Sequence, residues 1–169
     1  MTGMNRDELL HWEQQARRSG TFIEGTELVA RWTLDQVFDR TGHPAGFGTS
    51  AFLRAIQACL ILAPQSEGPS DQALAVANQV SFGPLLLRFE GQGQLIGKRP
   101  LLQFSFAELI IKLGTLTLHR RAIPAPSAKS MPFFALIRLD HQAGTLVARG
   151  RGGGLALWRR ASSESSHGR

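Results

Sequence analysis

The chain has 169 residues, a length typical of one domain, and 43% of them are hydrophobic, which is enough to form a core. Its single cysteine excludes an internal disulfide and a zinc site built from cysteines, and it fits a reducing compartment. The net charge of +6 is uneven, because residues 1–90 carry 7 cations against 10 acids whereas residues 91–160 carry 11 against 2. A basic C-terminal half favours an anionic partner, although a merely solvated rim fits equally well.

The N-terminal residues 5–18 have the pattern of an amphipathic helix. Asn5 can cap the first turn, acidic residues follow it, and two arginines close the last turn, as the helix dipole favours. One stripe is apolar and consists of Leu9, Trp12 and Ala16. Gly20 then ends the helix, and we expect its stripe to pack against the rest of the domain. The N-terminus lacks the apolar core of a secretory signal, and no apolar stretch is long enough to span a bilayer, so we expect a soluble or peripheral protein.

Two further elements are expected before residue 73. Residues 27–38 alternate and place Leu28, Ala30, Trp32, Leu34 and Phe38 on one side, which predicts a half-buried strand. Residues 49–62 predict a second helix. Cys59 falls in the apolar run of that helix and is expected to be an inert core residue rather than a nucleophile.

From residue 73 onward, short apolar segments alternate with glycine-containing turns. The expected strands are ALAVANQVSFG, PLLLRFEG closed by GQGQ, LLQFSF, a long strand LIIKLGTLTLHRR bent at Gly114, PFFALIRLD, TLVARG and LALWRR. Strands at this spacing with few helices predict a mainly β barrel or sandwich. Residues 1–160 are thus expected to form one domain, and residues 161–169 a disordered polar tail.

The segment ARGRGGGLALWRR, at 148–160, raises the question whether its glycines cradle a phosphate. A dinucleotide fingerprint needs a third glycine where Leu155 stands, and only fifteen residues follow Gly154, too few for a βαβ unit. There is also no G-K-[ST] sequence. The segment instead predicts strand, turn and strand, with glycines of positive φ in the turn and arginines bracketing it as an anion-binding rim.

The same segment resembles the C-terminal motif of the plastid lipid-associated proteins, the fibrillins of chloroplasts and cyanobacteria. That motif runs Arg-Gly, two variable residues and an apolar strand ending in Arg, matched here by Arg149, Gly150, Gly153, Leu155, Leu157 and Arg160. The early-strand and mid-chain patterns of the family are matched by Trp32 with Leu34 and by Asn78 with Val80. The chain departs from the family at Leu146, where an arginine is frequent, and at Ala30, where a glycine is usual.

The resemblance implies a lipocalin-like antiparallel β-barrel of about eight strands, with an N-terminal helix and one further helix. It also implies a protein peripheral to thylakoid membranes, on their cytoplasmic or stromal side, that binds a lipid, a prenylquinone, or a pigment such as a carotenoid. A barrel of this size can hold one small ligand. The side chains expected to bind that ligand are Trp32, Phe82, Leu102, Phe104, Phe106, Phe133 and Trp158.

A second set of residues is expected to meet an anionic membrane surface or an acidic photosynthetic protein. These residues are Lys98, Arg99, Arg120, Arg121, Arg149, Arg151 and Arg160. Nucleic acid is not favoured, because the aromatic residues are expected to face inward rather than to stack on bases. For Trp32, a structural role under Arg159 or Arg160 at the barrel end is preferred to ligand contact.

No motif for catalysis or metal binding is present. The five histidines, His11, His43, His119, His141 and His167, show no paired metal spacing, and the serines lie outside any nucleophile elbow. We therefore expect a non-enzymatic binding or carrier protein. Two alternatives stay open: an assembly factor for a photosynthetic complex, with a barrel filled by side chains, and a chromophore lyase for phycobiliproteins, whose basic mouth would suit acidic tetrapyrroles.

Overall fold

The computed structural model describes residues 5–44, 58–65 and 72–161. Two helices, α1 (Arg6–Ser19) and the short α2 (Gly25–Leu28), precede the first strand, β1 (Ala30–Phe38). The strands that follow are β2 (Cys59–Pro64), β3 (Ala73–Phe82), β4 (Leu85–Ile96), β5 (Leu101–Leu113), β6 (Leu116–Ala122), β7 (Phe133–Asp140), β8 (Thr145–Gly150) and β9 (Leu155–Arg160), with one 3-10 turn, η1 (Ala128–Ser130), before β7.

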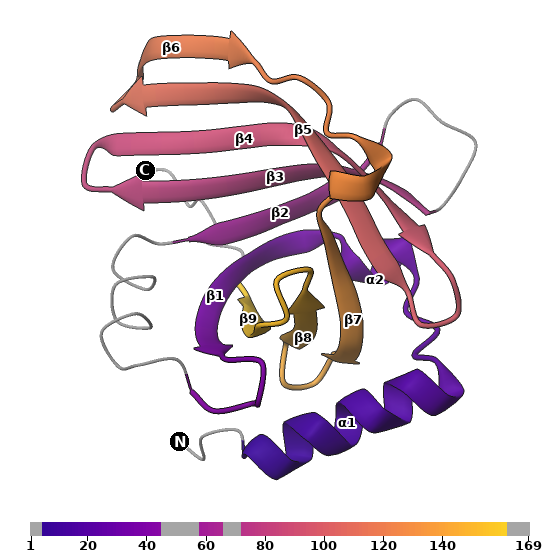
Figure 1. Cartoon of the computed structure of the whole chain (residues 1–169). Coiled ribbons are helices and arrows are strands. Elements are labelled where there is room, and N and C mark those ends of the chain that lie inside the picture. The colour runs from indigo at the N-terminus through magenta and orange to yellow at the C-terminus, as the bar shows by residue number, and fades with distance from the viewer. Residues whose placement is uncertain (1–4, 45–57, 66–71, 162–169) are drawn as a thin grey trace.

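The strands form one antiparallel sheet that closes on itself. Its order is β4-β3-β2-β1-β9-β8-β7-β5-β6, and β4 also pairs with β5. That extra pairing closes eight strands into a ring and leaves β6 outside it, attached to β5 (Figure 1). The mainly β, barrel-like fold with an N-terminal helix and one further short helix confirms the fold prediction.

The strand β5 divides its outer edge between two partners. Its first residues, Leu101–Gln103, pair with β7, whereas Glu108–Leu113 pair with β6. β5 and β6 therefore continue beyond the ring as a hairpin, beside the hairpin of β3 and β4 (Figure 1). This arrangement leaves the ends of four strands standing clear of the closed part of the barrel.

Two hydrophobic clusters hold the fold together. One lies inside the ring and includes Trp32, Leu102 and Leu136. The other lies between α1 and the outer face of β1, β7, β8 and β9, and consists of Leu9, Phe38, Ile137, Val147, Leu155 and Leu157. The strands under α1 are buried on both faces as a result, so the helix is part of the core rather than an appendage.

The N-terminal helix agrees with its prediction. The Asn5 side chain accepts a hydrogen bond from the Asp7 amide at 3.3 Å, and Glu8 completes a capping box. Gly20 ends the helix with a φ of 77°. The apolar stripe packs on the barrel as expected, since Leu9 and Ala16 are buried.

The predicted second helix at 49–62 is wrong over its last residues. Residues 59–62 belong to β2, the strand between β1 and β3, and among the described residues the further short helix is α2. Residues 49–57 lie outside the described part of the chain. A short apolar run such as CLILA fits a buried helix and a buried strand equally well, and only the pairing with its neighbours decides.

A bulge in β1 also changes one predicted face. The register with β9 shifts between Leu34 and Gln36, so the alternation breaks at that point. Trp32 and Leu34 face the ring interior, but Phe38 turns outward and packs under α1. The prediction that Phe38 shares a side with Trp32 is therefore wrong.

Two expectations about glycines in the β region need correction. Residues 109–121 form the β5–β6 hairpin rather than one bent strand, with Gly114 at a φ of 58° in its tight turn. The GQGQ segment continues β4 rather than ending it. Its glycines allow a close approach of the neighbouring strand, because a Cβ atom at Gly91 would lie 1.8 Å from the Ser105 carbonyl oxygen.

Candidate functional site

The arginine- and glycine-rich segment near the C-terminus forms the β8–β9 hairpin, as predicted. The Gly150 amide donates to the Gly154 carbonyl at 2.9 Å, and Gly153 has a φ of 89°. After the turn, Leu155 and Leu157 face α1 whereas Trp158 faces the ring interior. The turn is therefore a β connection and no part of a dinucleotide-binding unit.

Trp32 makes the contact expected at the barrel end. The Arg160 guanidinium carbon lies 5.2 Å from the centroid of the Trp32 ring, a cation–π geometry. The indole nitrogen donates to the Leu28 carbonyl at 2.8 Å, and the side chain is fully buried. All of its polar capacity is used within the fold, which fits a structural role.

The other side chains expected to bind ligand lie at different depths. Leu102, Phe104 and Trp158 are buried inside the ring, and Phe106 is half-buried. Phe82 is 66% exposed at the β3–β4 turn. Phe133 is half-buried and does not belong to the interior cluster. Its chain neighbour Phe134 is the aromatic residue of β7 that packs against that cluster.

The interior aromatics form a connected row that leads outward. Ring centroids are 6.2 Å apart between Trp158 and Phe134 and 5.3 Å apart between Phe134 and Phe104. The row continues from Phe104 to Phe106 at 5.4 Å and from Phe106 to Phe89 at 5.5 Å. Because Phe89 and Phe106 are half-buried, an apolar path runs from the centre of the ring to its surface.

That path opens onto the ends of β3, β4, β5 and β6. Residues paired across antiparallel strands project to the same face. One row of pairs joins Val80, Leu87 and Ile111, and Val80 also packs against the interior cluster. We call the whole surface the apolar platform and define it by Val80, Phe82, Leu85, Leu87, Phe89, Leu109, Ile111, Leu113 and Leu116.

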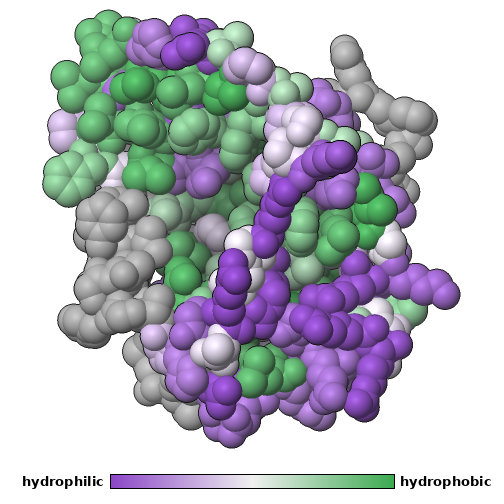
Figure 2. Space-filling model, in the orientation of Figure 1, coloured by the Kyte–Doolittle hydropathy of each residue, from purple (hydrophilic) through white to green (hydrophobic). Residues whose placement is uncertain are grey.

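The apolar platform is open to solvent at its outer end. Leu113 is 47% exposed and Leu116, its partner across the β5–β6 hairpin, is 63% exposed. Figure 2 shows hydrophobic residues gathered over the free ends of β4, β5 and β6, and mostly hydrophilic ones over α1. An exposed apolar surface of this kind marks an interaction site, since isolated apolar residues are the norm elsewhere.

Positive charge is in excess beside the apolar platform. Residues 80–88 and 109–121 contain no acidic residue. Two of their cations are paired, Arg88 with Glu90 at 2.6 Å and Arg120 with Glu108 at 3.1 Å. Lys112 and Arg121 have no hydrogen bond or ion pair with any residue in the described ranges, so their charges face solvent uncompensated.

The residues expected to form one basic rim are divided among separate places. Arg120 and Arg121 lie on β6, whereas Lys98 and Arg99 lie in the β4–β5 turn, roughly 26 Å away along β5 at 3.3 Å per residue. Arg160 covers Trp32. At physiological salt, charges act together only within about 8–10 Å, so these groups are electrostatically independent.

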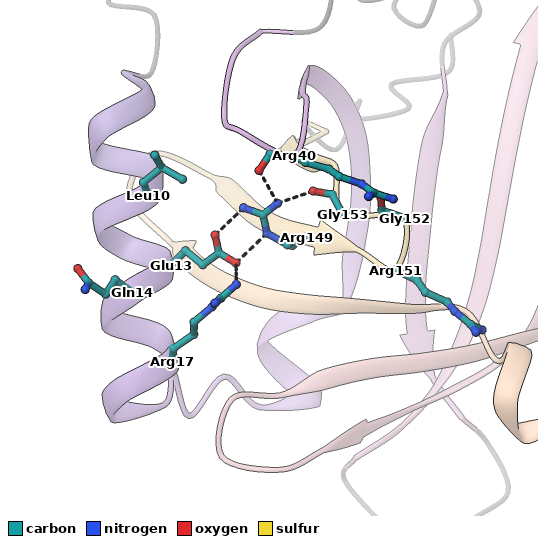
Figure 3. A pocket seen from close by; sticks show the side chains of 9 residues that line it. All are labelled: Leu10, Glu13, Gln14, Arg17, Arg40, Arg149, Arg151, Gly152 and Gly153. Atoms are coloured by element: carbon teal, nitrogen blue, oxygen red, sulfur yellow. Dashed lines mark hydrogen bonds and ion pairs between the residues drawn. The ribbon is translucent and has the colours of Figure 1, made fainter.

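A second site, which we call the arginine pocket, lies between α1 and the β8–β9 turn (Figure 3). It is open to solvent, has a volume of about 600 Å³, and is lined by Glu13, Arg17, Arg40, Arg149, Arg151 and the glycines of the turn. The Arg149 guanidinium donates to both carboxylate oxygens of Glu13, at 2.7 and 2.5 Å. Arg17 and Arg99 also donate to Glu13, at 2.9 and 3.4 Å.

Glu13 is the electrostatic centre of this pocket. Burial favours the neutral acid, but the hydrogen bonds and charges of Arg149 and Arg17 outweigh it and hold the pKa of Glu13 below its ordinary value. Burial also lowers the pKa of Arg99, and the nearby Arg17 and Arg149 lower it further. Positive charge is thus in excess around the single carboxylate.

Sequence reasoning missed Glu13. The residue stands four positions after Leu9 and three before Ala16, on the stripe of α1 that packs against the barrel. An acidic residue on a buried stripe signals a cationic partner, because a buried charge is rarely left unpaired. The i,i+4 spacing makes Arg17 one partner, but Arg99 and Arg149 are distant in sequence and could be identified only once the fold was known.

Neither a metal-binding group nor a membrane-spanning helix adds a further candidate site in the described part of the chain, and no match to a known protein adds one. Within the described ranges, no group of three His, Cys, Asp or Glu side chains is placed to hold a metal ion. None of the helices described there is both long enough and apolar enough to cross a membrane. Comparison of the sequence with protein-family models gives no match, and comparison with curated proteins gives none either.

Proposed function

We propose that this is a non-enzymatic binding protein whose apolar platform docks on an anionic membrane and holds an apolar ligand. The ligand class is a lipid, a prenylquinone or a carotenoid-like pigment, and the membrane is the thylakoid, on its cytoplasmic or stromal side. The observation that carries the proposal is the continuity of one apolar face from the buried core to the exposed ends of β3–β6.

The membrane part of the proposal rests on apolar area and charge together. Phe82, Leu113 and Leu116 present large side chains that are about half exposed or more. Burial of apolar surface is worth about 25 cal/mol per Å², so several such residues supply a few kcal/mol of binding. The free cation Arg121, whose partner on β5 is the platform residue Leu109, adds about 1 kcal/mol against an anionic surface.

The ligand part of the proposal places the ligand near the platform and not in the middle of the ring. Trp32, Leu102 and Phe104 are packed into the buried cluster and leave the centre occupied by side chains. Phe89 and Phe106 are the aromatics that keep partial exposure. A flat or elongated apolar molecule would lie against them, with the platform as the floor of its site.

The packed centre favours one second candidate, an assembly factor that uses the platform to bind an apolar segment of a photosynthetic protein. Both candidates use the same surface, and they differ in what covers it. A membrane or a small ligand can cover the platform without a complementary shape, whereas a protein partner needs a surface of its own that fits the platform.

The test measures co-sedimentation of the full chain with vesicles of phosphatidylcholine, with and without phosphatidylglycerol. We expect binding to the anionic vesicles that weakens as salt rises. The double variant Leu113→Glu, Leu116→Glu should weaken this binding at least about tenfold, because it removes exposed apolar area and adds repulsive charge. Ile96→Glu is the matched control, since Ile96 is 43% exposed but lies at the opposite end of β4.

Two results would contradict the proposal. Equal binding by the platform variant and by Ile96→Glu would show that the platform is not the docking surface. Failure of the wild type to bind anionic vesicles, together with retention of an acidic thylakoid protein in a pull-down, would favour the assembly factor. Mass spectrometry of organic extracts from protein purified from its native cell then identifies any bound ligand.

A further inference from the structure

We propose that the arginine pocket binds a phosphate-type oxyanion, either a free organic or inorganic phosphate or the phosphate of a lipid headgroup. This site is separate from the apolar platform. Glu13, which lines the pocket, accepts a hydrogen bond from Arg99, just before the start of β5. The platform residue Leu113 is at the other end of β5, roughly 40 Å from its start at 3.3 Å per residue. The inference therefore goes beyond the proposed membrane and ligand function.

The first argument is the balance of charge. Four arginines line the pocket, Arg17, Arg40, Arg149 and Arg151, and the single carboxylate among the lining residues is Glu13. That carboxylate already accepts hydrogen bonds from Arg17, Arg99 and Arg149. The one negative charge of Glu13 is thus shared by three arginines and leaves Arg40 uncompensated, so an external anion would supply the missing counter-charge.

The second argument is the orientation of Arg40. Its Nε donates to the Gly152 carbonyl at 2.8 Å, which fixes the plane of the guanidinium beside the turn (Figure 3). Its two terminal amino groups have no partner among the residues that the structure describes. A guanidinium held by one edge offers its other donors as a ready fork for two oxygens of a phosphate.

Arg17 supplies a second donor from the opposite wall. It gives one terminal amino group to Glu13 at 2.9 Å, and its side chain is otherwise 59% exposed. Arg151 contributes less, because its guanidinium turns away to the carbonyls of Lys129 and Met131. Arg17 on α1 and Arg40 beside the turn thus offer an oxyanion in the pocket free donors from its two walls.

The walls of the pocket are fixed before any ligand arrives. The Arg149 side chain is only 15% exposed and also donates to the carbonyls of Arg40 and Gly153, which ties α1, the segment after β1 and the turn together. Gly153 leaves room for the Arg40 stem, since a Cβ atom there would lie 2.8 Å from Arg40 Cγ. A pre-formed site loses little entropy on binding.

A purely structural network would explain Glu13 and Arg149 but not the exposed cations. Attaching α1 to the barrel requires the Glu13–Arg149 pair. It does not require the free amino groups of Arg40 or the exposed part of Arg17. These two residues therefore carry the test, and Glu13 and Arg149 are left unchanged in it.

The experiment is calorimetric titration of the full chain with inorganic pyrophosphate at constant ionic strength, with glycerol 3-phosphate as a second probe. We expect saturable binding by the wild type, weakened about tenfold or more in Arg17→Gln and in Arg40→Gln. Arg18→Gln is the matched control, an exposed arginine of α1 that does not line the pocket, and should bind as the wild type does. Thermal unfolding of each variant verifies that the fold is retained.

Two further experiments test whether the pocket acts independently of the platform and whether its phosphate belongs to a lipid headgroup or is free. Leu113→Glu, Leu116→Glu removes docking through the platform, and it should keep the wild-type affinity for pyrophosphate. The platform variant is then tested on phosphatidate vesicles, with and without Arg40→Gln. If it binds the vesicles and Arg40→Gln abolishes that binding, the pocket takes a lipid headgroup. If it binds only the soluble phosphates, the pocket takes a free phosphate. Absence of saturable binding by the wild type, or equal affinities of Arg17→Gln, Arg40→Gln and Arg18→Gln, would overturn the proposal without affecting the proposed membrane function.

Discussion

Replacing Gly153 by alanine tests how the β8–β9 turn is built. Gly153 has a φ of 89°, a conformation that costs an L-residue about 1–2 kcal/mol. A Cβ atom at this position would lie 2.8 Å from Cγ and 2.9 Å from Nε of Arg40. Arg40 must then shift and strain its bond to the Gly152 carbonyl, worth about 1 kcal/mol. Gly153→Ala should therefore lower the free energy of unfolding by about 1–3 kcal/mol.

The neighbouring glycine is the matched control. Gly152 has no positive φ, and a Cβ atom there would meet nothing within 4 Å. Gly152→Ala is expected to be neutral or to stabilise by a few tenths of a kcal/mol, because it restricts the unfolded chain. Urea unfolding followed by tryptophan fluorescence measures both, and each kcal/mol corresponds to about 2–4 °C in the thermal midpoint.

A double-mutant cycle separates the two contributions at Gly153. Arg40→Ala removes the atoms that the new Cβ would meet, so Gly153→Ala in that background should retain only the cost of its backbone conformation, about 1–2 kcal/mol. Equal losses of stability for Gly152→Ala and Gly153→Ala would refute the reasoning. An unchanged cost in the Arg40→Ala background would show that contact with Arg40 plays no part.

Three further predictions concern Glu13, Arg160 and Cys59. Glu13→Gln should destabilise the protein by about 1.5–3 kcal/mol, because it weakens the charge-assisted hydrogen bonds from Arg149, while Arg149 keeps its bonds to the Arg40 and Gly153 carbonyls. The folded state lowers the pKa of Glu13 below its ordinary 4.5, so the stability that Glu13 contributes is full above pH 4.5 and is lost as the pH drops through the folded pKa. Acid unfolding curves of Glu13→Gln should therefore fall less steeply than those of the wild type. Arg160→Gln should cost about 0.5–2 kcal/mol through the lost contact with Trp32, and a smaller effect than that of Arg159→Gln would contradict this. Burial raises the pKa of the Cys59 thiol, so a bulky thiol reagent should label the native protein far more slowly than the unfolded one.

Local chemistry was sufficient to predict several elements from the sequence. The start of α1 follows from Asn5, whose side chain satisfies a free amide of the first turn, and its end follows from Gly20. The β8–β9 turn follows from its glycines, because positive φ is a property of one residue and its neighbours. The Trp32–Arg160 contact was expected from the resemblance to a known family, and the register of β1 with β9 brings the two residues together.

The tertiary structure decided whatever depends on partners distant in the chain. The run CLILA became β2 because β1 and β3 offered it hydrogen bonds on both edges, which no local signal records. The same is true of β6, which lies outside the ring because β7 takes the other part of the β5 edge. Long-range pairing gains its free energy only once the chain is closed, so it leaves no pattern within a short window.

The two candidate sites show the same division. The apolar segments of β3–β5 were expected as strands from the sequence, but only the register joined their apolar residues into one face that continues beyond the ring as the apolar platform. The charges of Arg17, Arg99 and Arg149 were visible as a basic composition, and Glu13 as one acid on a buried stripe. Packing of α1 on β7–β9 brought them within hydrogen-bonding distance, because a buried carboxylate requires such partners and the fold alone determines which cations can reach it.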